Sequence, residues 1–403
     1  MKNNNELAKE ALLKKASLGE DIDINDYNQI TEENPYIENL SSLNNQDRNR
    51  MREAGIEASE EGRTGTFLQM DHSVVHESSH QEGLEIMSIA SALEKYDWLT
   101  DYFGKLVPVD TDKYTATTHL NPHQGYFIRA LPGVKTTFPI QACLFIGKER
   151  LSQNVHNVII AEEGSELNII TGCATASHVK EGLHIGINEF YVKKGAKISF
   201  TMIHAWAENI MVRPRTSTII EEDGVFLSNY ICLKPVKSLQ MYPTAKLIGK
   251  GAMARYNSII YAHANSNLDV GSRVILSAPN TKAEIIARTI ANGGNIITRG
   301  HLVGEMPNTK AHLECRGLII GNGLVHAIPE IEGKVEGIDL SHEAAVGKIA
   351  QEEIEYLMAR GLSVSEATST IVRGFMDVSI MGLPDTLTKE IDKAIKSCGE
   401  EMM

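Results

Sequence analysis

A cysteine and a histidine–glutamate pair stand about one structural repeat apart in this sequence. Cys315 lies in HLECRGLIIG, residues 312–321, and His342 and Glu343 follow in DLSHEAAVGKIA, residues 339–350. Thiolate and imidazole both bind iron and zinc. If the chain coils with a period near the separation of Cys315 and His342, the two could stack on neighbouring coils and share a metal ion. The alternative is that Cys315 is a packed core thiol, since free cysteine is often fully buried.

The side chains of the adjacent histidine and glutamate cannot both face the same site on a strand. His342 and Glu343 are neighbours, so on a strand they point to opposite faces and only one can face a given site. Such a pair is normally a surface feature, and its spacing from Cys315 is what makes it a candidate.

The remaining cysteines add one further candidate. The chain has five cysteines, widely scattered, which form neither a disulfide framework nor a CxxC pair. Cys173 stands between small residues in IITGCATASH, after a strand-like run, where a thiol can be accessible enough to accept sulfur or can equally be packed. A cluster held by this chain would need mixed ligands, a labile cluster or ligands from two subunits.

The segment VVHESSH, residues 74–80, contains the H-E-x-x-H pattern of zinc peptidases. On a helix, His76 and His80 would share one face, with Glu77 as general base. β-Branched residues precede the pattern, two serines fill it and Gly83 follows closely, and no third ligand is clear. We interpret the segment as a polar loop rather than a peptidase site.

Charge and composition exclude several function classes. The 52 acidic and 39 basic residues give a net charge of -13, which argues against binding to nucleic acid or an anionic membrane. No apolar run is long enough to span a bilayer and the N-terminal segment lacks a signal-like apolar core, so we expect a cytoplasmic protein. There is no G-x-x-x-x-G-K-[ST] motif, so we expect no nucleotide bound through a P-loop. With 6% aromatic residues and no column of carboxylates, a β-helical carbohydrate-active enzyme is disfavoured.

A sequence pattern repeats from about residue 108 to 338: a turn, a small residue, then alternating apolar positions. The residues that follow successive turns are Ser165, Ala196, Val225, Ala252, Ala283 and Ala311. Their steps of 31, 29, 27, 31 and 28 indicate a solenoid, and strand runs with turn signals favour a parallel β-helix. By this alignment the positions equivalent to Cys315 are Phe200, Asn229, Tyr256 and Ala287, a mixed column that could simply be core.

Helical patterns flank this region. Residues 1–107 are predicted to form an N-terminal helical region, 108–338 the parallel β-helix core, and 339–403 a C-terminal helical region. Ser363 and Glu366 have the spacing of a capping box, and LPDTLTKEIDKAIKSCG predicts a further helix after Pro384. The fold class expected is mainly β, with helices at both ends.

Several segments resemble the SufB/SufD family of iron–sulfur cluster assembly proteins, from about Arg63 to Leu383. TGCATA and ISFTMIHAW are similar to its G-C-T-A-P box and following strand, and DVGSRVIL and NTKAEIIARTI to its next conserved stretch. The most specific matches are CRGLIIGNGLVHAIPEIE and SHEAAVGKIAQEEIEYLMARGLSVSEATSTIVRGF. The cysteine before GLIIG and the His-Glu pair favour the SufB side. The proline of the G-C-T-A-P box is Ser177 or absent here.

The resemblance implies an architecture and partners. It implies a right-handed parallel β-helix, C-terminal helices that dock on a SufC-like ABC ATPase, and subunits that pair through their β-helices. It implies a scaffold, not an enzyme, that builds a transient cluster of the 4Fe–4S type from iron and from sulfur supplied by a donor protein. The short chain suggests a minimal homodimer rather than a SufB/SufD-type heterodimer. The alternative is a SufD-like structural or iron-delivery subunit that holds no cluster.

The resemblance also implies functional roles for individual residues. Cys315 is implied as cluster ligand and sulfur acceptor, His342 and Glu343 as iron or cluster ligands, and Cys173 as the cysteine where sulfur enters. His204 and Trp206 fall near positions that line a route inside the β-helix, although His204 replaces the usual amide. Glu332 is a further candidate to complete the ligand set.

Overall fold

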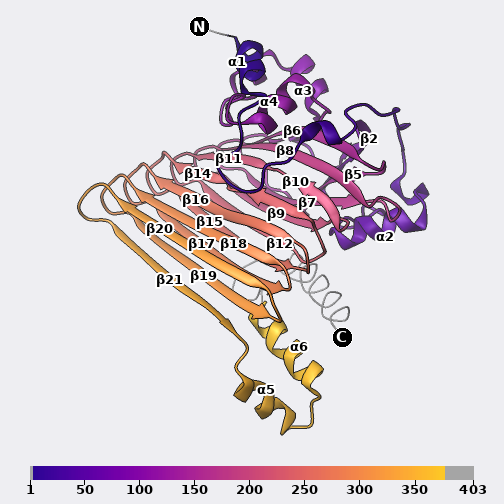
Figure 1. Cartoon of the computed structure of the whole chain (residues 1–403). Helices are drawn as coiled ribbons and strands as arrows, with labels where there is room; N and C mark the ends of the chain where they lie inside the picture. The colour runs from indigo at the N-terminus through magenta and orange to yellow at the C-terminus, as the bar shows by residue number, and fades with distance from the viewer. Residues whose placement is uncertain (1–2, 377–403) are drawn as a thin grey trace.

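Short strands separated by tight turns coil into a β-solenoid of about eight turns, with helices at both ends, which confirms the expected fold class (Figure 1). The computed structural model describes residues 3–376. The helix expected after Pro384, and Cys398, lie outside the described residues.

Two sheets form the walls of the solenoid. Sheet 1 runs in the order β2 (Ser73–Ser79), β1 (Gly65–Met70), β5 (Ile140–Ile146), β7 (Glu166–Thr175), β9 (Lys197–Ala205), β12 (Val225–Cys232), β15 (Met253–Ala262), β17 (Lys282–Asn292), β19 (Lys310–Ile320), β21 (Asp339–Lys348). Sheet 2 runs in the order β10 (Asn209–Val212), β13 (Ser238–Met241), β16 (Asn267–Leu276), β14 (Thr244–Leu247), β11 (Arg215–Ile220), β8 (Glu181–Val192), β6 (Leu151–Ala161), β4 (Tyr126–Ala130), β3 (Leu84–Ser88), and β18 (Asn295–Gly304) joins β16 to β20 (Leu324–Gly333).

Helices lie in the N-terminal and C-terminal parts of the chain (Figure 1). Within residues 3–376 the α-helices are α1 (Asn4–Ala11), α2 (Asn45–Glu53), α3 (Ile89–Lys95), α4 (Lys113–Leu120), α5 (Gln351–Met358) and α6 (Val364–Phe375). The same part of the chain has three short 3₁₀ helices, η1 (Ile24–Asp26), η2 (Leu40–Ser42) and η3 (Asp97–Asp101). The predicted capping box of Ser363 and Glu366 begins α6.

The boundaries of the three regions differ from those expected. The N-terminal region, predicted to be helical as far as residue 107, also contains β1, β2 and β3, which pair with the first turns of the solenoid. At the other end, β21 adds one more strand after residue 338, and helix begins only at Gln351. His342 and Glu343 are therefore on the last strand of the solenoid rather than in a helical region.

One turn recurs at the same place in each coil, and its chemistry explains why the chain stacks. The residue with left-handed backbone there is always Gly, Asp or Asn: Gly133, Gly164, Gly195, Asp223, Gly251, Asn280, Asn308 and Gly337. These residue types tolerate positive φ best. Neighbouring turns are hydrogen-bonded, as in the Gly164 N–H that donates to the Lys194 carbonyl at 3.0 Å. The local turn preference and the stacking of coils therefore reinforce each other.

The interior is filled by alternate residues of each strand. Phe226 lies between Phe190 and Tyr256, with ring centroids 5.0 and 5.8 Å away. Along β19, Leu313 and Cys315 are buried in this core. Glu314, the residue between them, faces outward.

Helices cover part of the outer face of sheet 1. Val372 and Met376, at the end of α6, pack on a row of outward isoleucines that includes Ile231 and Ile259. The Arg288 guanidinium on β17 also donates to the Phe375 carbonyl at 2.9 Å. The α5–α6 hairpin is thus attached to the later coils of the solenoid.

Candidate functional site

Cys315 lies on the inner face of β19, one strand from the end of sheet 1. It is 0% exposed, and the inward residues aligned with it on earlier strands are Ala287, Ser258, Tyr230 and Met202. Burial raises the pKa of its thiol to about 11, and the nearby Thr298 hydroxyl offsets part of that rise. The thiol is therefore protonated and weakly nucleophilic in this state.

The column predicted for Cys315 from sequence is correct only at Ala287. The true repeat positions at the start of the strands are Lys197, Val225, Met253, Lys282, Lys310 and Asp339, which are 28 or 29 residues apart. The sequence alignment pairs Val225 with Ala196, one residue away from its true partner Lys197. It also pairs Ala283 with Ala252, two residues away from its true partner Ala254. A shift of one residue moves a position to the other face of the sheet.

His342 is not stacked on Cys315, as the spacing had suggested. The residue paired with Cys315 on β21 is Ala344, and His342 pairs with Leu313. The two side chains share a face of the sheet but are offset by one strand and two residues, which places their Cα atoms about 8 Å apart. His342 is exposed at the open end of the solenoid.

Glu343 lies on the opposite face of the sheet from Cys315. It pairs with Glu314, whose side chain faces outward, and it accepts a hydrogen bond from the Arg316 guanidinium at 3.2 Å. Glu332 is on the outer face of sheet 2, where its carboxylate is 3.7 Å from both His301 and Lys334. Within one chain, neither glutamate is brought to the Cys315 thiol.

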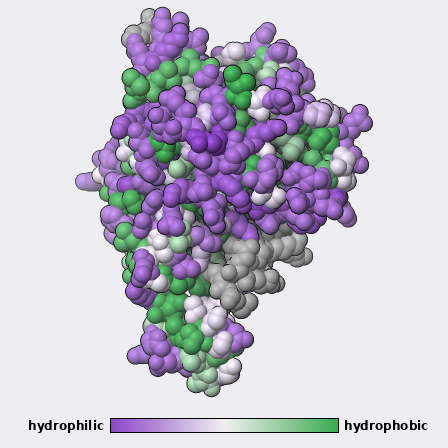
Figure 2. All heavy atoms as spheres, turned by 45° about the vertical axis from the view of Figure 1, so that its right-hand side comes forward, coloured by the Kyte–Doolittle hydropathy of each residue, from purple (hydrophilic) through white to green (hydrophobic). Residues whose placement is uncertain are grey.

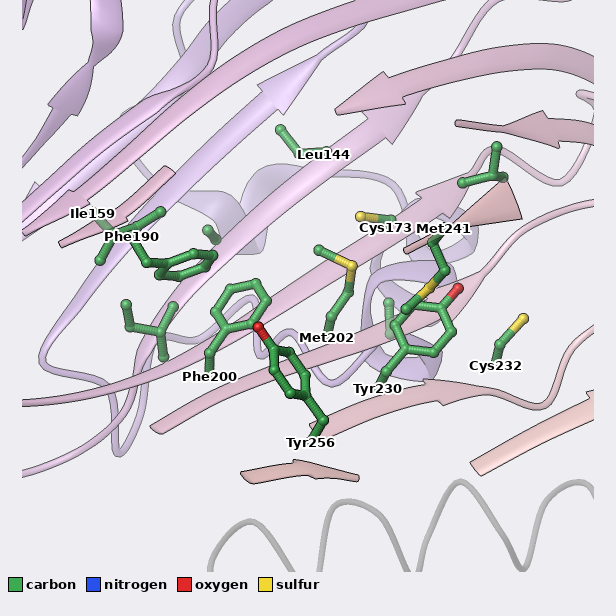
Figure 3. Close-up of a cluster of buried hydrophobic side chains, with 14 of the residues drawn as sticks. Leu144, Ile159, Cys173, Phe190, Phe200, Met202, Tyr230, Cys232, Met241 and Tyr256 are labelled. Carbon is green, nitrogen blue, oxygen red and sulfur yellow. The ribbon is translucent and has the colours of Figure 1, made fainter. Parts of the chain in front are cut away.

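Cys173, His204 and Cys232 form a second inward column on three successive strands. Cys173 on β7 pairs with His204 on β9, which pairs with Cys232 on β12. Burial raises the pKa of Cys173 well above its usual value and lowers that of His204 well below, so both side chains are neutral. The Tyr230 hydroxyl lies 2.7 Å from His204 Nδ1. Figure 3 shows Cys173, Met202, Tyr230 and Cys232 in this interior cluster.

Trp206 completes an aromatic group around His204. Its ring centroid is 5.3 Å from that of His204 and 5.1 Å from that of His184. Within residues 3–376, His204 Nε2 and Trp206 Nε1 are buried without hydrogen-bond partners. Arg50 on α2 donates to the Ala205 and Trp206 carbonyls and so fixes the chain beside this group.

A cavity of about 40 Å³ lies inside the solenoid between the two thiol sites. Met202, Tyr230, Ser258, Ala287 and Thr298 are among its lining residues. The first four are the aligned column that ends at Cys315. The volume has room for only a few water-sized species.

The H-E-x-x-H segment lies on β2 as far as Ser79, with His80 directly after it, so it is neither the expected loop nor a helix. His76 Nδ1 contacts the Ile37 carbonyl at 2.7 Å, and His76 Nε2 is 3.3 Å from Glu60. Because a strand points alternate residues to opposite sides, Glu77 does not lie beside the two histidines as it would on a helix.

Sequence reasoning passed over four residues of these sites. Cys232 and Tyr230 accompany His204, and the signal that could have found Cys232 is its distance of one coil from His204. His312 and Glu314 flank Cys315 closely in sequence. They form with Glu343 the one group of three potential metal ligands found in the described part of the chain.

Comparison with known proteins gives consistent similarities. Residues 144–375 match the family model described as "SUF system FeS cluster assembly, SufBD core domain". A protein of Archaeoglobus fulgidus, named an iron–sulfur cluster assembly SufBD family protein, is 52% identical over 358 residues, covering 89% of this chain and 96% of the relative. A protein of the same name from Methanothermobacter thermautotrophicus strain Delta H is 46% identical over 395 residues, covering 96% of each chain.

A more distant relative from Staphylococcus haemolyticus, also named for the SufBD family, is 32% identical over 355 residues, 84% of this chain and 75% of the relative. Among the described residues, no helix has the length and apolar character needed to cross a membrane.

Proposed function

Because the chain belongs to the SufBD family of the SUF system for iron–sulfur cluster assembly, we propose that it is the scaffold subunit on which a nascent cluster is built at Cys315. The observation that carries this proposal is the position of Cys315, a buried thiol one strand from the open end of the solenoid. The cluster, of the 4Fe–4S type, is cargo assembled from iron and sulfur.

The free edges of the solenoid support assembly between two copies of the chain. β21 ends sheet 1 and β20 ends sheet 2 among the described strands, and β21 is exposed along most of its length. An exposed edge strand presents unpaired backbone groups to another chain. A second subunit paired there would bring its own ligands near Cys315 and His342, which one chain alone does not join into a ligand set. We favour a homodimer over a SufB/SufD-type pair.

The C-terminal hairpin supports docking of a SufC-like ABC ATPase. Tyr356, Met358 and Val364 are large exposed apolar residues on α5 and at the start of α6. Figure 2 shows apolar atoms gathered at this end of the molecule. Since α6 packs on β12, β15 and β19 of sheet 1, motion of an attached ATPase would act on the coils next to Cys315.

Sulfur delivery is proposed to begin at Cys173. A donor protein would supply sulfur there, and the interior cavity and the group of His204 and Trp206 lie in the direction of Cys315. The neutral His204 has a nitrogen that no hydrogen bond occupies in residues 3–376, which suits it to contact a passing sulfur species. Rearrangement of the coils would widen this route.

Anaerobic reconstitution of the chain in its complex with the ATPase and ATP, supplied with ferric iron, sulfide and a thiol reductant, tests the proposal. We expect visible thiolate-to-iron absorbance that persists after gel filtration, with iron and sulfide bound in equal amounts. A SufD-like structural subunit would bind no cluster under these conditions. Protein without retained absorbance or sulfide would therefore contradict the scaffold role.

A further inference from the structure

Three outward side chains at the end of sheet 1 form a cluster with metal-binding chemistry. His312 and Glu314 lie on β19 and Glu343 on β21, and one ligand atom from each lies within 4.8 Å of the others. The cluster is on the opposite face of the sheet from Cys315, because the buried Leu313 and Cys315 alternate with His312 and Glu314 along the strand. It is therefore distinct from the thiol site.

The hydrogen bonds leave ligand atoms available. His312 Nδ1 lies 2.9 Å from the Ser341 hydroxyl, so its Nε2 is the nitrogen that remains. An imidazole oriented through its other nitrogen is the usual arrangement for a metal-binding histidine. Glu314 Oε1 is buried, and within residues 3–376 its ion pair with Arg316 Nε does not have hydrogen-bond geometry. A buried carboxylate oxygen without a well-directed hydrogen bond is costly, so this atom is open to a better-placed cation.

Arg316 is the competing partner. Its Nε is 3.0 Å from Glu314 Oε1 and its Nη2 is 3.2 Å from Glu343 Oε1. The side chains of Arg316 and Glu343 are 42% and 56% exposed, so solvent screens this pair, whereas Glu314 is only 16% exposed. One guanidinium also offsets only one of the two carboxylate charges. A divalent ion would offset both charges and would take the place of the guanidinium.

We propose that His312, Glu314 and Glu343 bind one divalent transition-metal ion on the outer face of the solenoid. One imidazole nitrogen and two carboxylate oxygens suit ferrous iron, manganese and zinc. Ligands at about 2.0–2.2 Å from a metal are roughly 3–3.5 Å from one another, so the exposed Glu343 must rotate inward. The identification of the ion as ferrous iron rests on the proposed function, whereas metal binding itself does not.

Anaerobic calorimetric titration of the apo-chain with Fe²⁺ alone, without sulfide, tests the site. Wild type is expected to bind one Fe²⁺ per chain. The variants His312→Ala and Glu314→Gln are each expected to bind at least about tenfold more weakly, since each removes a ligand. Circular dichroism checks that each variant is folded.

Two controls separate this site from others. Glu284→Gln changes a carboxylate on the same face one strand earlier, paired with His312, and should leave Fe²⁺ affinity unchanged. Cys315→Ser should also retain Fe²⁺ binding. Absent binding in wild type, unchanged binding in His312→Ala and Glu314→Gln, or loss of binding in Cys315→Ser would each overturn the inference. If wild type binds Fe²⁺ at this site yet forms no cluster with sulfide, the inference stands and the scaffold proposal fails.

Discussion

The variant Cys315→Ser is expected to lose the iron–sulfur cluster completely after anaerobic reconstitution while the solenoid stays folded. A hydroxyl does not replace thiolate as a ligand for cluster iron, and no other cysteine in residues 3–376 is on the last three strands of sheet 1. Burying a hydroxyl at this fully buried position costs about 1–3 kcal/mol, which is less than the stability of most domains. Visible absorbance and bound sulfide measure the cluster, and circular dichroism measures the fold.

Cys143→Ser is the matched control for that experiment. Cys143 is also fully buried, but it lies on β5, at the other end of sheet 1. The same change of sulfur to oxygen there should give a similar loss of stability and leave the cluster at wild-type level. Wild-type absorbance in Cys315→Ser, or equal losses in both variants, would contradict the assignment of Cys315.

Phe226→Ala is expected to destabilise the solenoid by about 3–5 kcal/mol, the usual cost of removing a buried phenylalanine ring. The Phe226 side chain is 1% exposed and packs between Phe190 and Tyr256. It also lines the interior cavity, so its removal leaves a larger void rather than a space that the walls can fill. The shift in the urea midpoint of unfolding measures the effect.

Leu227→Ala provides the comparison on the same strand. Leu227 follows Phe226 but faces outward and is partly exposed, so less apolar area returns to water when it is truncated. We expect a loss of stability smaller than half of that for Phe226→Ala. A larger effect at Leu227 would mean that the assignment of inner and outer faces of β12 is reversed.

The sequence was sufficient to predict that the chain coils into a solenoid. It was not sufficient to predict which residues align on neighbouring strands. Glycine, asparagine and aspartate at recurring turns are strong local signals, and they predicted the solenoid. The small residue after each turn is a weaker marker. This marker makes Val225 equivalent to Ala196, whereas the structure aligns Val225 with Lys197, and the difference of one residue puts Asn229 on the wrong face. Strand periodicity makes faces sensitive to such errors.

The candidate site shows the same limitation. The interval between Cys315 and His342 is two residues short of the coil at that point, where Cys315 pairs with Ala344. Coil length is set by the turns, and sequence spacing does not fix it to within two residues. Sequence reasoning did predict that His342 and Glu343 point to opposite faces, which the structure confirms. It did not assign Glu343 to the face of His312 and Glu314.

The roles of individual residues came from family resemblance rather than from physical pattern. For both Cys173 and Cys315 the alternative interpretation is a structural thiol packed in the core, and both are fully buried. Burial does not separate a core thiol from a thiol that is protected between reaction cycles. In the proposed mechanism the distinction depends on a second subunit and an ATPase, which a single chain's sequence does not describe.

Mass-spectrometric measurement of Cys315 alkylation tests the central claim, that the cluster thiol is closed until the assembled complex opens it. At about pH 8 a pKa of about 11 leaves roughly 100-fold less thiolate than the ordinary value of 9.0, and the rate should rise about tenfold per pH unit until the pH approaches that pKa. We predict slow alkylation in the chain alone and in its complex with the ATPase, and much faster alkylation once ATP is added. Equal rates with and without ATP, or rapid alkylation of the chain alone, would contradict the account.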